Sequence, residues 1–148
     1  MLPTFEIFLN HPDAKMPTKA HVTDAGWDVY SVDDITIDAG DRKVVETGLH
    51  INMTTSVENW ECQIRPRSGH AAKLGLSIVN SPATCDFSYT GPVKVILLNT
   101  SKEVIKLPKG SKIAQLVFQK VPIVELKQVS EMFKERERGS NGFGSTGT

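Results

Sequence analysis

The segment RPRSG, residues 65–69, groups side chains that are suited to binding phosphate. The guanidinium groups of Arg65 and Arg67 can each hold two oxygens, and Ser68 adds a hydroxyl beside Gly69. Backbone N–H groups near a glycine supply further donors to an anion. The segment therefore predicts a phosphate cradle, and a surface turn with solvated arginines explains it equally well.

Two carboxylates stand in segments that could serve such a ligand. Asp28 follows a glycine turn in AGWDVY. Asp86 closes NSPATCD, and we expect residues 80–91 to form a hairpin whose backbone edge could read a planar base. A carboxylate beside phosphates can hold a hydrated Mg²⁺, and a carboxylate beside a water can act as a general base. A turn or cap position explains Asp28 as well, and an Asx-turn explains Asp86.

Other kinds of chemistry lack their sequence patterns. The four histidines show no metal-ligand spacing, and no Walker-type phosphate loop is present. Cys62 and Cys85 form no C-x-x-C pair, and we expect both to be buried free thiols.

The elements that must position these groups are short strands. Apolar and polar residues alternate over residues 49–53, 60–64 and 93–97, with turn signals between the runs. This pattern predicts one all-β domain, a sandwich or barrel. Helix is expected only as one turn over residues 71–74 and as a short solvated helix over residues 130–138.

Composition excludes partners that are held by bulk charge or by lipid. The 148 residues carry 17 basic and 17 acidic side chains, so nothing resembles the basic surplus of a nucleic-acid binder. The densest apolar run, around residues 93–98, contains Lys94 and is far shorter than the ~20 residues of a membrane span. The N-terminus lacks a basic region before an apolar run, so we expect no secretory signal and a cytoplasmic location.

The end of the chain differs in composition from the rest. The segment GSNGFGSTGT is rich in glycine and hydroxyl residues and cannot bury a core. We therefore predict a single domain over residues 1–137 and a flexible tail over residues 138–148. Phe143 stands between two glycines, which frees its ring to lie flat on a planar group.

The order of five segments resembles a known family. AGWDVY, RPRSG, NSPATCDFSYTG, GSKIAQLV and RGSNGFGSTG are similar to the motifs of the deoxyuridine triphosphate nucleotidohydrolases, or dUTPases, from about Lys19 to the C-terminus. The resemblance implies a distorted jelly-roll of the β-clip type and a homotrimer with active sites shared between subunits. It also implies Mg²⁺-dependent hydrolysis of dUTP to dUMP and diphosphate by water attack at the α-phosphorus. That reaction keeps uracil out of DNA and supplies dUMP for thymidylate synthesis.

The resemblance also implies roles for individual residues. Asp86 would deprotonate the attacking water, and Asp28 would contact Mg²⁺ through water. Tyr89 would pack against the deoxyribose and exclude a 2′-hydroxyl, and Phe143 would stack over the uracil. The residues implied for phosphate are Arg67, Ser68, Gly69, Gln115, Arg138, Ser145 and Thr146. The residues implied for uracil and deoxyribose are Asn80, Thr84, Cys85, Asp86, Tyr89, Lys94 and Phe143.

Several positions depart from the family pattern. Ala83 replaces a common glycine and Cys85 a common isoleucine. Ser88 replaces a frequent acid, and Asn141 stands at a common glycine position of the tail. Lys112 replaces the usual arginine and lacks its bidentate fork. The base, the phosphate serine and the stacking aromatic are all retained, so we expect activity to survive.

Two other functions use the same features. A dCTP deaminase shares the fold but needs a glutamate at the pyrimidine edge, where this chain has Asp86 and no glutamate nearby. A nucleotide-gated regulatory protein would use ordering of the tail over bound nucleotide to control a partner.

Overall fold

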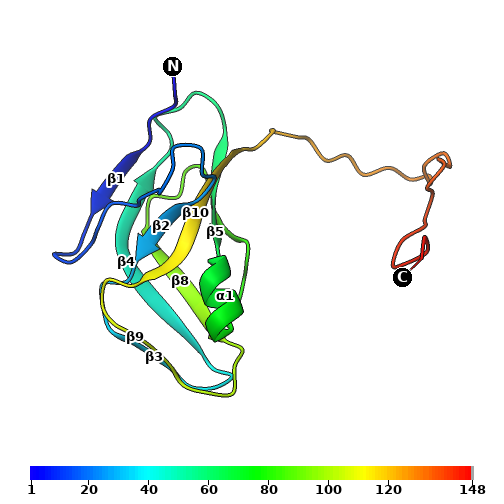
Figure 1. Ribbon diagram of the computed structural model, residues 1–148. Helices are drawn as coiled ribbons and strands as arrows, with labels where there is room; N and C mark the ends of the chain where they lie inside the picture. The colour runs from blue at the N-terminus through cyan, green and yellow to red at the C-terminus, as the bar shows by residue number, and fades with distance from the viewer. Residues whose placement is uncertain (148) are drawn as a thin grey trace.

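Two four-stranded antiparallel sheets enclose one hydrophobic core in the structure, a computed structural model that describes residues 1–147 (Figure 1). The predicted all-β class is confirmed, because the described chain has ten strands and one short helix. Within the described residues no helix is long and apolar enough to cross a membrane.

The first sheet has the strand order β1-β4-β8-β6. Its strands are β1 (Glu6–Leu9), β4 (Arg42–Asn52), β8 (Pro92–Asn99) and β6 (Leu76–Ile78). The predicted alternation holds in β8 and, from Val45 onward, in β4, where every second side chain enters the core. The pairing of β4 with β8 shifts register between Glu46 and His50. Gly48 lies within this bulge at φ +70°, a backbone conformation that a residue with a Cβ rarely adopts.

The second sheet has the strand order β2-β10-β5-β7. Its strands are β2 (Trp27–Tyr30), β10 (Lys112–Lys120), β5 (Trp60–Arg65) and β7 (Ala83–Cys85). A separate two-stranded ladder joins β3 (Ile35–Ile37) to β9 (Ile105–Leu107). The only helix of the described residues is α1 (Ser68–Leu74), which follows β5 and contains the predicted turn over residues 71–74.

Aliphatic side chains from both sheets fill the space between them. Fully buried members of this core are Val29, Leu49, Met53, Cys62, Leu97, Ala114 and Leu116. Burial of each large aliphatic side chain contributes roughly 1.5–3 kcal/mol, so the core provides a rigid support for the polar residues at the sheet ends. Both cysteines are buried free thiols, as predicted.

Two local expectations are wrong. Residues 80–91 do not form a hairpin, because β6 pairs with β8 in one sheet whereas β7 pairs with β5 in the other. Residues 130–138 form no helix. A helix of that length is marginal in water without a packing surface, and no core lies beside this segment (Figure 1).

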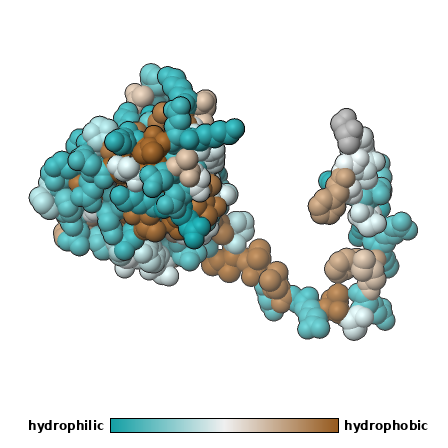
Figure 2. All heavy atoms as spheres, turned by 90° about the horizontal axis from the view of Figure 1, so that it is seen from below, coloured by the Kyte–Doolittle hydropathy of each residue, from teal (hydrophilic) through white to brown (hydrophobic). Residues whose placement is uncertain are grey.

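The chain leaves the sandwich after β10. Residues 121–147, here called the arm, contain no helix or strand and extend away from the body, with the predicted tail at the far end (Figure 1). Apolar side chains along the arm are exposed: Ile123, Val124, Leu126, Val129, Met132 and Phe133. Figure 2 shows this apolar stretch between the body and the distal part of the arm.

Candidate active site

Asp28 lies at the centre of a charged cluster on the second sheet. The Nε of Arg67 donates to its Oδ1 at 2.9 Å, and the Nζ of Lys112 lies 3.2 Å from its Oδ2. The Asp28 side chain is 21% exposed, so water screens these ion pairs only in part. Two cations around one carboxylate leave a net positive charge, which favours an anionic ligand.

Gln115 joins this cluster to the segment before α1. It is the cross-strand partner of Asp28 on β2 and of Arg65 on β5. Its Nε2 donates to the carbonyl of Pro66 at 3.0 Å. A Cβ on Gly26 would lie 1.9 Å from the Gln115 Oε1, so only glycine leaves room for the amide. The sequence predictions for Asp28, Arg67 and Gln115 therefore converge on one place.

The predicted phosphate cradle lies at the start of α1. Arg67 is extended, with φ −90° and ψ 134°, and Ser68 and Gly69 are exposed at the beginning of the helix. No side chain caps the first turn, so its backbone N–H groups face outward without an intrahelical partner. Burial, and then the positive charge of Arg67, lowers the pKa of His70 below its ordinary value of 6.5. His70 therefore adds little positive charge at neutral pH, and the charge of the cradle comes from its arginines.

Strand β7 places two polar side chains outside the core. Ala83 and Cys85 point inward and are buried, so Thr84 and Asp86 point outward and are exposed. Ala83 does not have a positive φ, and the alanine therefore strains no backbone here. Because β7 is the last strand of its sheet, one edge of its backbone pairs with β5 and the other edge pairs with no described strand. Those edge groups can form hydrogen bonds with a planar base.

The turn after β7 holds Tyr89 by hydrogen bonds to the backbone of the turn itself. The N–H of Tyr89 donates to the Asp86 carbonyl at 3.0 Å, and its Oη donates to the Pro92 carbonyl at 2.9 Å. A Cβ on Gly91 would lie 2.6 Å from the Tyr89 ring, so glycine is required where the ring crosses the turn. The structure thus brings the predicted residues Asp86 and Tyr89 onto one turn. Asn80 lies exposed before β7 in the link between the sheets.

Cys85 can meet a ligand only through its backbone. Its side chain lies opposite Cys62 on β5 and faces the core. The hydrogen bond with Cys85, and then burial, raises the pKa of the Cys62 thiol. Cys62 therefore remains protonated, and both side chains pack as small core residues.

Lys94 contacts none of the site residues described above. It is the cross-strand partner of Glu46 in the first sheet, and its Nζ lies 3.2 Å from the Glu46 Oε1. Its proposed place in the nucleotide pocket stays a prediction.

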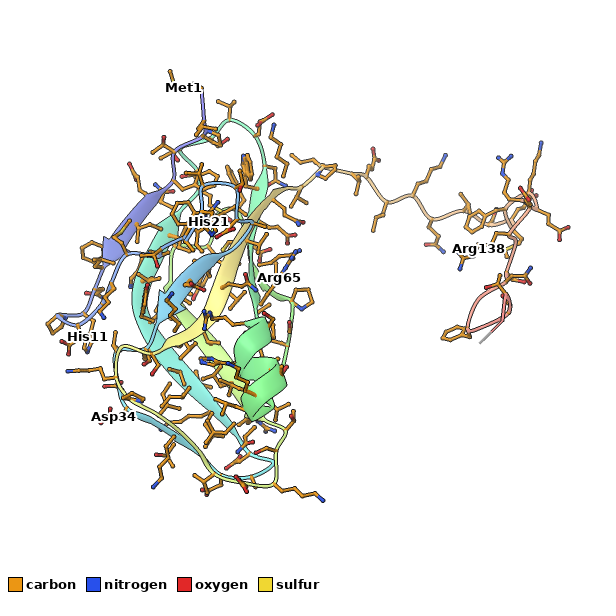
Figure 3. The ribbon with its side chains drawn as sticks, in the orientation of Figure 1. Met1, His11, His21, Asp34, Arg65 and Arg138 are labelled. Carbon is orange, nitrogen blue, oxygen red and sulfur yellow. The ribbon has the colours of Figure 1, made fainter. Side chains whose placement is uncertain are left out.

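The described residues of the tail do not contact the body of their own chain (Figure 1). Arg138, Ser145 and Thr146 are exposed, and Phe143 is fully exposed at φ +50°. The Arg138 Nε donates to the Asn141 carbonyl at 3.1 Å, a contact internal to the tail. Figure 3 shows Arg138 on the arm, far from Arg65 on the body. Arg65 is the cross-strand neighbour of Gln115 and so indicates where the cluster lies.

Sequence reasoning missed two contacts. From the sequence, Lys112 is only a replacement for arginine without its fork, yet it pairs with Asp28 across β2 and β10. His50 is only a polar residue of an alternating strand, yet its Nδ1 lies 2.8 Å from the Thr90 carbonyl beside Tyr89. These pairs are separated by 84 and 40 positions in the sequence, and no local pattern indicates them.

The oxygen donors of the cluster fit a hydrated Mg²⁺ that arrives with phosphates. Both oxygens of Asp28 already face cations, and Gln115 adds one neutral amide oxygen nearby. Across residues 1–147, no three acidic, histidine or cysteine side chains converge on a metal site. Mg²⁺ commonly keeps several waters and takes its other ligands from one or two carboxylates and from substrate phosphates. The donor set therefore fits contact through water.

This β-sandwich, with its positively charged cluster around Asp28, matches known proteins along nearly its whole length. A family model described as dUTPase matches residues 12–147. The deoxyuridine 5′-triphosphate nucleotidohydrolase of Clostridium tetani is 42% identical over 144 residues, 97% of each chain. The enzyme of that name from Corynebacterium diphtheriae is 44% identical and covers 92% of this chain and 88% of its own.

A solved structure agrees with these sequence relatives. The dUTPase of Staphylococcus bacteriophage 80alpha with dUpNHpp superposes with a TM-score of 0.88 and 28% identity, over 99% of this chain and 100% of that one. The chain belongs to the dUTPase family, as the five ordered motifs predicted.

Proposed function

We propose that this protein hydrolyses dUTP to dUMP and diphosphate by attack of water at the α-phosphorus. Two groups of residues carry the proposal, both in a chain that belongs to the dUTPase family. One is the positive cluster of Asp28, Arg67 and Lys112 beside Ser68. The other is the β7 edge with Asp86 and Tyr89.

The β7 edge is suited to read the base and the sugar. Backbone donors and acceptors of residues 83–85 distinguish uracil from cytosine by the hydrogen-bond pattern at the pyrimidine edge. Tyr89 packs against the deoxyribose, where its ring leaves no room for a 2′-hydroxyl. Asn80 borders the same pocket. A site built on hydrogen bonds rejects a ligand that cannot supply them, because its own groups are then left unpaired.

Asp86 acts as the general base of the proposed reaction. Its exposed carboxylate, at the end of β7, takes the proton of the attacking water. One positioned base contributes typically 10²–10⁴-fold, so charge stabilisation and alignment must contribute the rest. Arg67, Ser68, Gly69 and Gln115 hold the phosphates. When bound with the nucleotide, Mg²⁺ would neutralise phosphate charge, and Asp28 would orient it through a water molecule.

The active protein is proposed to be a homotrimer whose sites are shared between subunits. In one chain the tail lies away from the body, and the apolar side chains of the arm are solvent-exposed, such as Leu126 at 92% and Met132 at 87%. Exposed apolar side chains in such number are typical of a surface that packs on another subunit. Arg138, Ser145 and Thr146 would then close over the phosphates of a neighbouring body, with Phe143 over the uracil. Light scattering tests this directly, and a monomer contradicts it.

A nucleotide panel tests the activity. The protein is incubated with dUTP, dCTP, dTTP or UTP and MgCl₂, and diphosphate and nucleoside monophosphate are measured, with EDTA as the metal control. The expected result is diphosphate from dUTP, little from the other three, and loss of the reaction in EDTA. Absence of diphosphate from dUTP overturns the proposal, and conversion of dCTP to dUTP with release of ammonia identifies a deaminase.

A regulatory role on the same fold is the second candidate. The related dUTPase of Staphylococcus bacteriophage 80alpha is described as controlling transfer of virulence genes by a G protein-like mechanism. In this chain the arm is the segment whose position nucleotide could change. A partner whose binding depends on dUpNHpp and is lost on removal of the tail would support this role.

A further inference from the structure

The turn of residues 86–92 carries the proposed base and the proposed deoxyribose contact. Phe87 packs against the core, but few hydrogen bonds hold the exposed part of the turn. Asp86, Tyr89 and Thr90 are exposed. Within the turn, Tyr89 bonds to the carbonyls of Asp86 and Pro92. Among the hydrogen bonds of the described residues, one side chain from outside reaches residues 87–91, and it is His50 on β4.

His50 reaches the turn through its Nδ1. This nitrogen lies 2.8 Å from the carbonyl oxygen of Thr90, which can only accept a hydrogen bond, so Nδ1 carries the proton. Its Nε2 lies 3.5 Å from the amide nitrogen of Asn10, at the outer limit of a hydrogen bond. The bond to Thr90 is therefore the shorter of the two polar contacts of the ring.

The surrounding fold fixes the direction of the His50 ring. His50 follows the Gly48 bulge and is the cross-strand partner of Pro92, the residue that ends the turn. A bulge re-aims the side chain that follows it. On the other side the ring packs against Phe8, with 6.0 Å between ring centroids. Together His50, Phe8 and Thr90 line a hollow of about 300 Å³.

We propose that His50 is a positioning residue for sugar selectivity: its Nδ1–H bond to Thr90 holds the Tyr89 ring where a 2′-hydroxyl would have to fit. The inference rests on the proposed function and deepens it. Tyr89 is 44% exposed, so core packing alone does not hold it in place. A hydroxyl is one heavy atom, so a small displacement of the ring is enough to admit a ribose.

Two substitutions of His50 separate its hydrogen bond from its ring. His50→Phe keeps the packing against Phe8 and removes the donor. His50→Asn loses the ring but places an amide N–H near the position of Nδ1. Asn52→Ala is the matched control, because Asn52 lies on the same strand and bonds to Glu6 rather than to the turn. Thermal unfolding confirms that each variant is folded.

The readout is the ratio of kcat/KM for dUTP to kcat/KM for UTP. Loss of one hydrogen bond predicts that His50→Phe lowers this ratio by about tenfold. His50→Asn is expected to restore it to within about twofold of the wild type, and Asn52→Ala to leave it unchanged. An unchanged ratio in His50→Phe overturns the inference. An equal loss in both His50 variants also overturns it, because the ring and not the hydrogen bond would then be responsible.

Binding measurements separate this inference from the proposed function. The ratio of dissociation constants for UTP and dUTP is measured in EDTA, where turnover is not required. If the wild type binds dUTP selectively but does not hydrolyse it, the proposed reaction fails while the His50 variants still test positioning. If the wild type has no preference for the deoxy sugar, the inference about His50 fails with it.

Discussion

The charged cluster on the second sheet and the tail differ in how much of their geometry one chain supplies. Asp28, Arg67 and Gln115 are joined by hydrogen bonds of 2.9–3.0 Å to one another or to adjacent backbone. Asp28 and Gln115 lie on strands that pack on the core, and Arg67 directly precedes α1. Arg138 makes only a contact within the tail, and Phe143 is fully exposed. The cluster is therefore organised before a ligand arrives, whereas the tail needs a ligand or a second chain to fix its position.

This contrast explains how a chain of zero net charge can bind a triphosphate. The body supplies a local excess of one positive charge around Asp28, and the tail carries a further arginine at its root. Charges that converge from two places raise the local potential without raising the net charge of the protein.

The largest expected effect comes from the body. Asp86→Asn removes the proposed base but keeps the size and exposure of the side chain. We expect kcat to fall by about 10²–10⁴-fold while dUTP affinity, measured in EDTA, changes little. Turnover near that of the wild type would contradict the assignment of Asp86.

Removal of the tail is expected to have the next largest effect. Deletion of residues 139–148 takes away Phe143, Ser145 and Thr146 but no core residue. We expect kcat to fall by on the order of 10²-fold, because donors aimed at developing charge are lost and water enters the site. Tm and the oligomeric state should not change. A fall in Tm would show that the tail belongs to the folded body, and retained kcat would remove it from the site.

A smaller effect tests whether the cluster is organised in advance. Gly26→Ala places a Cβ 1.9 Å from the Gln115 Oε1 and forces the amide away from the Pro66 carbonyl. We expect a loss of about 1–3 kcal/mol in the free energy of unfolding, typical of overpacking, and a rise in KM for dUTP. Gly142→Ala in the tail is the control, since nothing lies within 4 Å of its Cβ and its Tm should equal that of the wild type. An unchanged free energy of unfolding in Gly26→Ala would show that the cluster is not rigid.

The smallest effect concerns pH. Burial and Arg67 lower the pKa of His70 in the folded state, and its Nδ1 is buried without a hydrogen-bond partner in the described chain. The unfolded state therefore binds a proton near pH 6.5 that the folded state does not. The contribution of neutral His70 to the free energy of unfolding is therefore complete above pH 6.5. It is lost as the pH falls from 6.5 toward the lower pKa that His70 has in the folded state. Urea unfolding between about pH 5 and 8 should show this slope. His70→Leu should reduce the slope, and an equal slope in that variant would exclude His70 as its source.

Local patterns predicted the body better than the links between its parts. Alternation over residues 93–97 identified a strand because one face of it meets the core. The sequence of residues 80–91 shows a turn but not which sheet receives the next strand, so a hairpin was predicted where the chain changes sheets. Residues 130–138 have helical composition, but without a packing surface composition did not produce a helix.

The site was predictable where the ordered motifs name residues and not where distant residues meet. Asp28, Arg67 and Gln115 were identified from their motifs and lie together. Lys112 and His50 contact partners that only the strand register brings near. The proposed meeting of tail and body is not visible in either, because it would require a second copy of the chain.

Subunit mixing tests the central claim, that one chain supplies the body of a site and another supplies its tail. Asp86→Asn and the protein lacking residues 139–148, each inactive alone, are unfolded together at equal concentration and refolded. In a random hybrid trimer each site has one chance in two of an intact base and one in two of an intact tail, so activity should return to about a quarter of the wild type. If tail and base come from the same chain, every site lacks one of them, and a mixture that stays inactive contradicts the account.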